Sequence, residues 1–395
     1  MRKFKDMLRN TLTYGSSILV ICLLLLIVGY IFLTGGKTFN FKMFVADYYE
    51  KPYFLTCETK SDLFHLENKN DIFYSQNWGI GLKDTTDLNG KKVIEIVYVD
   101  NLSPLKNAFL KENNNAFEVK SGLLINRIII KNSDVAALYT AEIGASQMAL
   151  ALDEGIILTE LYLLQMGGGI RGSLLSTVYL ILLTLLMVIP LGVISAIYFT
   201  TLAKNNRFNR FLLALIDMIS GIPSIIFGLL GLMCFIPIVS KMSGTSGGSI
   251  ISGALTMTIM LLPIVIKTTM EAIYTIPESY KSASLALGAS TSQTIFKIIL
   301  PNALGGILTS VLLAIGRIIG ESAALIFAIG TYISDSVSLT GTSTTLAVHI
   351  WSLIGGENPN YKAASSISIV ILLVVLILNL TVKLISYKLD KARIK

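Results

Sequence analysis

The chain has 395 residues, of which 53% are hydrophobic and only 14% are charged, and its mean hydropathy is +0.68. Soluble domains carry about 25% charged residues, so this composition excludes an ordinary soluble protein and predicts a chain embedded in a lipid bilayer. The net charge of +7 does not indicate nucleic-acid binding, because the polar stretch 36–165 holds 17 of the 25 acidic residues but only 13 of the 32 basic ones. The basic excess belongs to the apolar part and its short loops, as expected when loop charge orients a membrane protein.

Six apolar runs are long enough to cross about 30 Å of hydrocarbon as helices. In chain order they are 16–34, 174–201, 211–239, 250–268, 304–332 and 364–385. Four basic residues precede the first run, which is longer than the apolar region of a signal peptide and is not followed by an A-x-A cleavage site. We therefore expect an uncleaved anchor and a multi-pass protein of the cytoplasmic membrane, with both chain ends in the cytoplasm beside the basic loops.

Residues 36–165 are predicted to form a small extracytoplasmic α+β insert between the first two spans. β-Branched residues favour strands over 91–100 and 117–130. Ser133 with Asp134 favours the start of a helix over 136–152. The expected domains are 1–35, the N-terminal tail with the first span; 36–165, the insert; and 166–395, the core with the other five spans.

The sequence predicts no nucleotide, cofactor or metal site. Residues 167–172 (GGGIRG) match the pattern G-x-G-x-x-G, but a membrane span follows them, where a dinucleotide site would need a βαβ unit and an acidic residue. The two histidines, His65 and His349, are far apart in the sequence, and the three cysteines show no C-x-x-C spacing. Neither a metal site nor a disulfide framework follows from such a pattern.

The loop between the fourth and fifth spans, 269–301, contains the signals of a short helix. Pro277 suits a helix start because its φ is fixed, and Gly288 suits a helix end. Between them, the small and apolar residues of 282–287 would give the helix a face that can sit in a groove of a partner, and Pro301 opens the next span. The alternative is an ordinary amphipathic connector.

In this region the sequence resembles the permease subunits of ABC-type importers, whose signature loop reads EAA, then a glycine, then an apolar pair ending in LP. The matching positions are Ser282, Ala283, Ser284, Gly288, Leu300 and Pro301. Within that superfamily the chain is most similar to the PstA phosphate permease subunits, which pair with PstC. The segments that carry this similarity are 221–228 (GIPSIIFG), 266–269 (IKTT), 306–309 (GILT), 316–322 (GRIIGES) and 344–346 (TTL).

Two features depart from the PstA pattern. Ser282 stands where the signature loop usually has a glutamate. If that carboxylate contacts the ATPase, the contact is either missing here or supplied by another residue, for which Glu278 is the candidate. The insert 36–165 is also longer than the short connection that is typical between the first two spans of PstA. The resemblance covers the chain from about residue 168 onward and says nothing of the insert.

The fifth span carries Arg317 and Glu321, four residues apart and therefore on one face of a continuous helix. An arginine at the bilayer centre costs at least about 2.5–3.5 kcal/mol, so one interpretation is a self-neutralised structural pair. The other is that Arg317 lines the path and donates its fork of N–H groups to a passing phosphate, with Ser322 beside it. Lys267 is either a further pathway residue or a lysine that snorkels to the interface.

The resemblance implies an all-α permease half of six membrane helices with a transverse coupling helix, in addition to the insert. Its implied partners are a second, PstC-like permease, two cytoplasmic ATPase subunits, an extracytoplasmic phosphate-binding protein and membrane lipid. Such a chain would translocate inorganic phosphate by alternating access and would not be an enzyme, because a separate subunit would hydrolyse ATP. A permease for molybdate or sulfate and a membrane ligand sensor are the alternatives, and an ion-coupled secondary transporter fits the loop less well.

Overall fold

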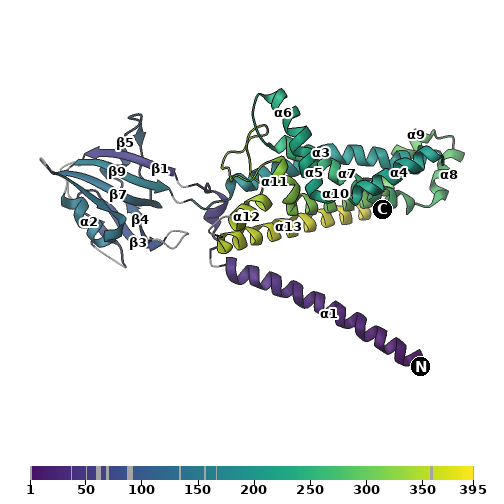
Figure 1. The fold of residues 1–395 in the computed structure, drawn as a ribbon, viewed down its shortest axis with the longest axis horizontal. Helices are drawn as coiled ribbons and strands as arrows, with labels where there is room; N and C mark the ends of the chain where they lie inside the picture. The colour runs from purple at the N-terminus through teal and green to yellow at the C-terminus, as the bar shows by residue number, and fades with distance from the viewer. Residues whose placement is uncertain are drawn as a thin grey trace. The chain divides into compact units, whose positions relative to one another are not determined.

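The computed structural model divides into two compact units, which we call the helical unit (Met1–Phe44 with Ile170–Lys395) and the sheet unit (Val45–Gly169). Figure 1 labels their helices and strands in chain order. The residues described are 2–36, 38–49, 51–58, 64–67, 71–86, 92–132, 135–154, 157–165, 167–355 and 359–394.

Among these residues, six helical segments are long and apolar enough to span a membrane, which confirms the predicted number. They are Asn10–Gly35, Arg171–Leu202, Ser224–Ser243, Ile250–Tyr274, Thr291–Gly320 and Tyr361–Ser386. The long helices are α1 (Arg2–Gly35), α3 (Arg171–Ile197), α7 (Ile250–Tyr274), α10 (Leu300–Gly320) and α13 (Tyr361–Ile394). The third segment consists of α5 (Ser224–Leu230) and α6 (Ile236–Ser243).

Three π-helical turns interrupt these segments: η4 (Tyr198–Leu202) after α3, η5 (Gly231–Phe235) between α5 and α6, and η6 (Ile295–Ile299) before α10. The shorter elements are η1 (Phe41–Phe44), α4 (Arg207–Ser220), α8 (Glu278–Ala286), α9 (Thr291–Thr294), α11 (Ala323–Ala328) and α12 (Leu346–Gly355).

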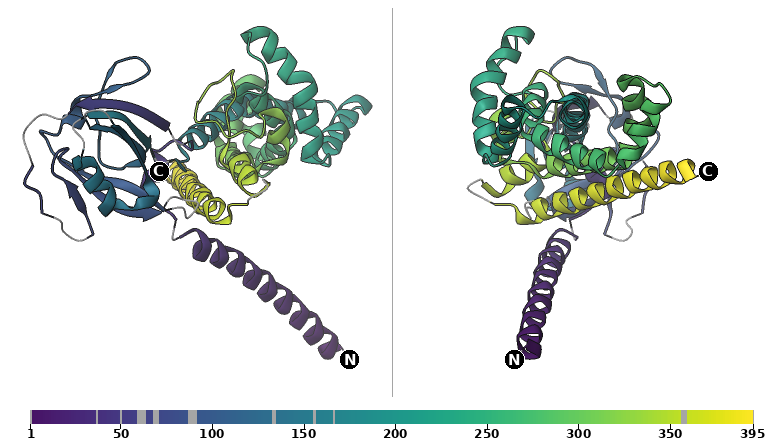
Figure 2. Two further views of the ribbon diagram at one scale, coloured as in Figure 1. Left: turned by 60° about the vertical axis from the view of Figure 1, so that its left-hand side comes forward. Right: turned by 90° about the vertical axis from the view of Figure 1, so that its right-hand side faces the viewer.

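Helix α7 is the core of the helical unit and packs against both α3 and α10 (Figure 2). Within its most apolar stretch 67% of the residues are buried, against 6% in α1. Glycines on the two neighbours allow this close approach: a Cβ on Gly192 of α3 would lie 2.5 Å from Val265, and one on Gly306 of α10 would lie 2.1 Å from Ala272. Small residues at such crossings are the usual means of helix association in membranes.

The predicted third span, 211–239, is wrong at its start. Helix α4 ends at Ser220, and α5 begins at Ser224 after a turn at Gly221, Ile222 and Pro223. Proline has no N–H to donate and disfavours helical geometry in the residue before it. Helix α4 is therefore a separate amphipathic helix that precedes the span.

The predicted fifth span, 304–332, is wrong at both ends. The helical segment begins at Thr291 and α10 ends at Gly320, where Glu321 has an extended backbone with φ −79° and ψ 120°. The Glu321 carboxylate accepts a hydrogen bond of 3.3 Å from the N–H of Ala324, at the start of α11. A side chain that caps the next helix is a typical reason for a helix to end and restart.

In the described part of the sheet unit, nine strands form one antiparallel sheet in the order β2-β3-β4-β7-β9-β1-β5-β6, with β8 beside β7. They are β1 (Lys51–Glu58), β2 (Phe73–Ser75), β3 (Ile80–Thr86), β4 (Lys92–Val99), β5 (Ala108–Leu110), β6 (Ala116–Phe117), β7 (Leu123–Asn132), β8 (Val135–Thr140) and β9 (Ile157–Gln165). Helix α2 (Ala145–Glu154) packs against the β2–β3 part of the sheet. Trp78, fully buried in the core, donates from Nε1 to the carbonyl of Leu152 at 2.9 Å.

The strand predicted over 91–100 corresponds to β4, and the strand predicted over 117–130 overlaps β7 but starts too early, because β7 begins at Leu123 after a turn. The helix predicted over 136–152 is wrong in its first half. Val135–Thr140 forms β8, which pairs with β7 along its length, and α2 begins only at Ala145. The expected caps Ser133 and Asp134 lie outside the described residues. Pairing with the long apolar neighbour β7 decides the conformation here, and the local helix signal is overridden.

A charged cluster on the sheet joins Glu160 of β9 to two cations. Glu160 accepts hydrogen bonds from Lys111 Nζ at 2.8 Å and from Arg127 Nη2 and Nε at 2.8 and 3.1 Å. The Arg127 guanidinium also lies 5.5 Å from the centre of the Tyr162 ring. The hydrogen bonds from Lys111 and Arg127 lower the pKa of Glu160 below its ordinary value of 4.5, although burial alone would raise this pKa.

Because this pKa is lower in the folded unit than in the unfolded chain, ionised Glu160 stabilises the fold above pH 4.5 and loses this effect as the pH falls through the lower folded pKa. We predict that Glu160→Gln lowers the free energy of unfolding at pH 7 by about 1–2 kcal/mol, since both cations are partly screened by solvent. It should also flatten the acid side of the stability profile. Thermal melts followed by Trp78 fluorescence, in a chain carrying Trp351→Phe, would measure both effects; parallel profiles for the two chains would contradict the prediction.

Candidate functional site

The first candidate site is α8, the helix of the loop 269–301. Pro277 directly precedes it as the N-cap, and Gly288 follows it with φ +83°, a backbone conformation that favours glycine. The N–H of Gly288 donates to Leu285 O at 3.0 Å, and that of Ala289 donates to Ser284 O at 3.2 Å. These contacts confirm the predicted start and end of the short helix.

The residues matched to the signature loop occupy different environments. Ser284 is buried, and its hydroxyl lies 2.9 Å from that of Thr294 in α9, so this residue fixes α8 to α9. Glu278, Ser282, Ala283 and Gly288 are exposed, and Ser282 Oγ donates to the Glu278 carbonyl at 3.2 Å. Leu300 and Pro301 are half-buried in the first turn of α10.

An exposed apolar surface covers α8 and its end, and it includes two residues of the face predicted over 282–287. Leu287 is 89% exposed, Tyr280 is 51% exposed and Leu285 is 43% exposed. Large apolar side chains gathered on a short polar loop are typical of a surface that contacts another protein. Leu285 and Leu287 belong to the face predicted over 282–287, whereas Tyr280 lies before it and was not predicted.

The second candidate site is the break between α10 and α11. Arg317 lies on an exposed face of α10 between Gly316 and Gly320, where an added Cβ would meet no atom within 4 Å. The predicted i, i+4 pair with Glu321 is not formed, because α10 ends at Gly320 and the Glu321 carboxylate caps α11. Within the described part of the chain, no carboxylate lies within ion-pair distance of Arg317. Ser322, the N-cap position of α11, is half-buried.

The helices that follow the two breaks contact each other. Helix α11, which follows the break after α10, packs against α5, which follows the break after α4. A Cβ on Gly228 of α5 would lie 2.8 Å from the carbonyl oxygen of Ala324. The irregular backbone of both spans is therefore concentrated in one region of the helical unit.

Lys267, the other predicted pathway residue, forms an ion pair. Its Nζ lies 2.6 Å from Asp217 Oδ1, and the side chains are 42% and 64% exposed. The pair joins α7 to α4, two turns before α7 ends at Tyr274. From the sequence alone, Asp217 received little weight, because a residue near the start of the predicted third span could lie close to the inner membrane interface.

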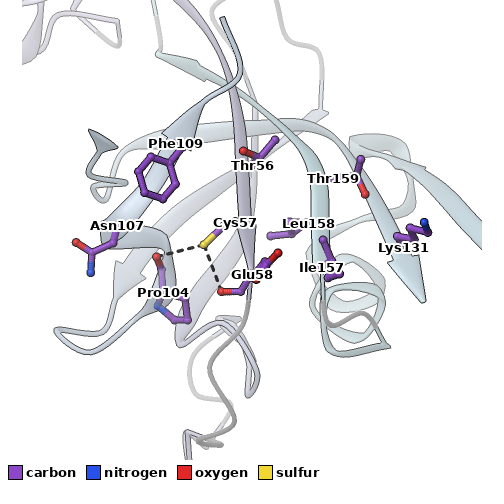
Figure 3. Close-up of a pocket in the computed structure, with 10 residues that line it drawn as sticks. All are labelled: Thr56, Cys57, Glu58, Pro104, Asn107, Phe109, Lys131, Ile157, Leu158 and Thr159. Carbon is purple, nitrogen blue, oxygen red and sulfur yellow. Dashed lines mark hydrogen bonds between the residues drawn. The ribbon is translucent and has the colours of Figure 1, made fainter. Parts of the chain in front are cut away.

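The sheet unit contains a cavity of about 650 Å³ between the ends of β1, β5 and β9 (Figure 3). Cys57 lies beside it, and its Sγ donates to the carbonyl of Pro104 at 3.3 Å. Burial raises the pKa of the Cys57 thiol to about 11, so the thiol stays protonated and unreactive at neutral pH. None of the predicted site residues lines this cavity, and the described residues contain no cluster of three or more His, Cys, Asp or Glu that could hold a metal ion.

Comparison with known protein families gives a match that falls within the helical unit. Residues 188–395 match the family model described as "Binding-protein-dependent transport system inner membrane component". The chain is 34% identical over 255 residues to the probable ABC transporter permease protein YqgI of Bacillus subtilis, which covers 61% of this chain and 84% of that protein. It is 33% identical over 160 residues to the phosphate transport system permease protein PstA of Haemophilus influenzae, covering 40% of this chain and 55% of the relative. Among solved structures, the inward-facing MetNI methionine ABC transporter matches with a TM-score of 0.45 and 21% identity, over 56% of this chain and 95% of that one.

We predict that Asp217→Asn and Lys267→Met each lower the melting temperature of the chain in lipid nanodiscs. An exposed ion pair contributes about 0–1 kcal/mol in water, and a charge that loses its partner beside the lipid costs more than it does in water, although less than at the bilayer centre. The exchanged pair, Asp217→Lys with Lys267→Asp, should therefore recover most of the loss. Lys297→Met, at an exposed lysine of η6, serves as the control; an exchanged pair as unstable as the single variants would show that the contact is not electrostatic.

Proposed function

Because the chain belongs to the family of binding-protein-dependent transport system inner membrane components, with PstA-type permeases among its relatives, we propose that it imports inorganic phosphate as one membrane subunit of an ABC transporter. Its partners would be a second, PstC-like permease, two cytoplasmic ATPase subunits and an extracytoplasmic phosphate-binding protein. The protein would lie in the cytoplasmic membrane with both termini in the cytoplasm and the sheet unit outside.

The observation that carries the substrate proposal is the exposed Arg317 on the glycine face of α10, which has no carboxylate partner among the residues that the structure describes. A guanidinium presents five N–H donors in a planar fork that fits the oxygens of a tetrahedral anion. The missing side chains at Gly316 and Gly320 leave room beside it for an anion or a neighbouring helix. Glu321 and Ser322 stand at the adjacent break, where the Glu321 charge would limit how tightly an anion is held.

Lys267 has a smaller role in this proposal than Arg317. Its charge is already compensated by Asp217 at 2.6 Å, so an anion would have to displace a carboxylate to reach it. We propose that Lys267 acts through the geometry of α7, which leads into the coupling loop, and that contact with the substrate belongs to Arg317.

Coupling to the ATPase would run through α8. The exposed face with Leu287, Tyr280 and Leu285 would dock in a groove of an ATPase subunit, with Glu278, Ser282 and Ala283 at its edge. The buried Ser284–Thr294 contact would pass the movement to α9 and then, through Leu300 and Pro301, to α10. Alternating access would follow, with ATP hydrolysed in the ATPase subunits and no reaction catalysed in this chain.

We predict that Arg317→Ala lowers ATP-dependent phosphate uptake by about 10- to 100-fold, the equivalent of losing charge-assisted hydrogen bonds of about 1.5–3 kcal/mol. Arg317→Lys should recover only part of the rate, because it keeps the charge without the fork. The measurement is uptake of labelled phosphate by proteoliposomes that contain the assembled complex and its binding protein, with Arg207→Ala, at an exposed arginine of α4, as the control.

Competing sulfate and molybdate identify the substrate in the same assay. Phosphate uptake that resists both anions supports phosphate as the substrate. Transport of sulfate or molybdate would instead make that oxyanion the substrate, and the proposal of an importer would still hold. A complex that assembles with an active ATPase but moves no anion would favour the membrane sensor.

We predict that Leu287→Glu releases the ATPase subunits. Burial of a leucine side chain at an interface contributes about 1.5–3 kcal/mol, so a charge in its place should weaken the association at least about tenfold. Ser292→Glu, at an exposed polar residue of α9, is the matched control. Copurification with a tagged chain measures the effect, and full recovery of the ATPase with Leu287→Glu would rule out this docking face.

A further inference from the structure

Three membrane-spanning helices, α1, α3 and α13, each have one end close to residues 35–44. Helix α1 ends at Gly35, and the Ser366 hydroxyl of α13 donates to the Gly35 carbonyl at 2.9 Å and lies 2.6 Å from the Thr38 hydroxyl. The N–H of Ile170, directly before α3, donates to the carbonyl of Met43 at 2.8 Å. Residues 35–44 therefore lie at the depth where three spans reach the same membrane surface.

An aromatic cluster occupies this short stretch. The ring centroids of Phe39, Phe41 and Phe44 lie 6.1–6.3 Å from one another. Phe41 and Phe44 are three residues apart in η1, and such positions fall on one side of a 3₁₀ turn. Phe41 is 80% exposed, and the adjacent Lys42 is exposed as well.

We infer that Phe39, Phe41 and Phe44, which we call the phenylalanine anchor, insert into the lipid at the membrane surface where α1 ends. Phe32 and Leu33, in the last turns of α1, are 48% and 80% exposed. The exposed apolar surface of α1 therefore continues up to the phenylalanine anchor. An aromatic group at the boundary between acyl chains and headgroups buries its ring and leaves the neighbouring lysine among the lipid phosphates. Phe39 and Phe44 are half-buried, whereas Phe41 is 80% exposed. At this depth lipid is the surrounding that would bury the exposed ring surface.

The inference does not depend on the transported substrate, only on the membrane-spanning assignment of α1, α3 and α13. The sheet unit begins at Val45, the residue after Phe44. An anchor at this point would hold the start of that unit at the lipid surface and limit the freedom of the connection from α1.

Site-specific photocrosslinking tests the anchor in the assembled transporter in native membranes. The photoreactive amino acid p-benzoylphenylalanine, which resembles phenylalanine in shape, would replace Phe41 and, in a second chain, Phe44. Leu24, 59% exposed in the middle of α1, is the control for lipid contact, and Leu102, 83% exposed in the sheet unit, is the control for an aqueous surface.

After irradiation, mass spectrometry of the peptide that contains the probe should show the mass gain of one phospholipid at positions 41 and 44, in a yield comparable with that at position 24. Position 102 should show no such gain. A crosslink from position 41 to another protein subunit, or no lipid adduct at 41 and 44 while position 24 reacts, would overturn the inference. The first of these results would assign the phenylalanine anchor to a subunit interface.

Discussion

Hydrocarbon offers no hydrogen-bond partner to a peptide group, and this constraint decides where the spans of the helical unit can be interrupted. Each of the two breaks meets it with local contacts. After α4, the N–H groups of Gly221 and Ile222 donate to Met218 O and Ile219 O at 3.1 and 3.2 Å, and Pro223 has no N–H that needs a partner. After α10, the carboxylate of Glu321 accepts from the N–H of Ala324. These contacts satisfy some of the backbone groups that the helix ends leave unpaired at each break.

The breaks also account for where charge lies in the helical unit. Glu321 would have paired with Arg317 in a continuous helix, but capping α11 uses the carboxylate and leaves the guanidinium on an open face. The turn at Gly221–Pro223 places Asp217 in α4, outside the third span, where it forms an ion pair with Lys267. One interruption therefore exposes a cation, while the other supplies a carboxylate that neutralises one.

Features set by neighbouring residues could be predicted from the sequence. The number of spans, the start of α8 after Pro277, its end at Gly288 and the strands β4 and β7 all follow from local composition or geometry. The Lys267–Asp217 and Ser284–Thr294 contacts could not be predicted, because they join helices whose relative placement depends on packing. The capping role of Glu321 was missed for a related reason. Spacing alone does not reveal whether a helix continues, and the N–H of Ala324 competes with an arginine for the oxygen atoms of the Glu321 carboxylate.

The π-helical turn η6 sets the rotational phase of α10. Each residue of a helix turns the side-chain direction by about 100°, and a π-helical turn contains one residue more than an α-helical turn. Removing one residue from Ile295–Ile299 would rotate all later side chains of α10, so that the glycine face and Arg317 would point into a different sector of the unit. The direction in which Arg317 points is therefore set about five turns earlier, at η6. For a relative that lacks this π-helical turn, an alignment without a gap at η6 would match Arg317 with a residue on a different side of the helix.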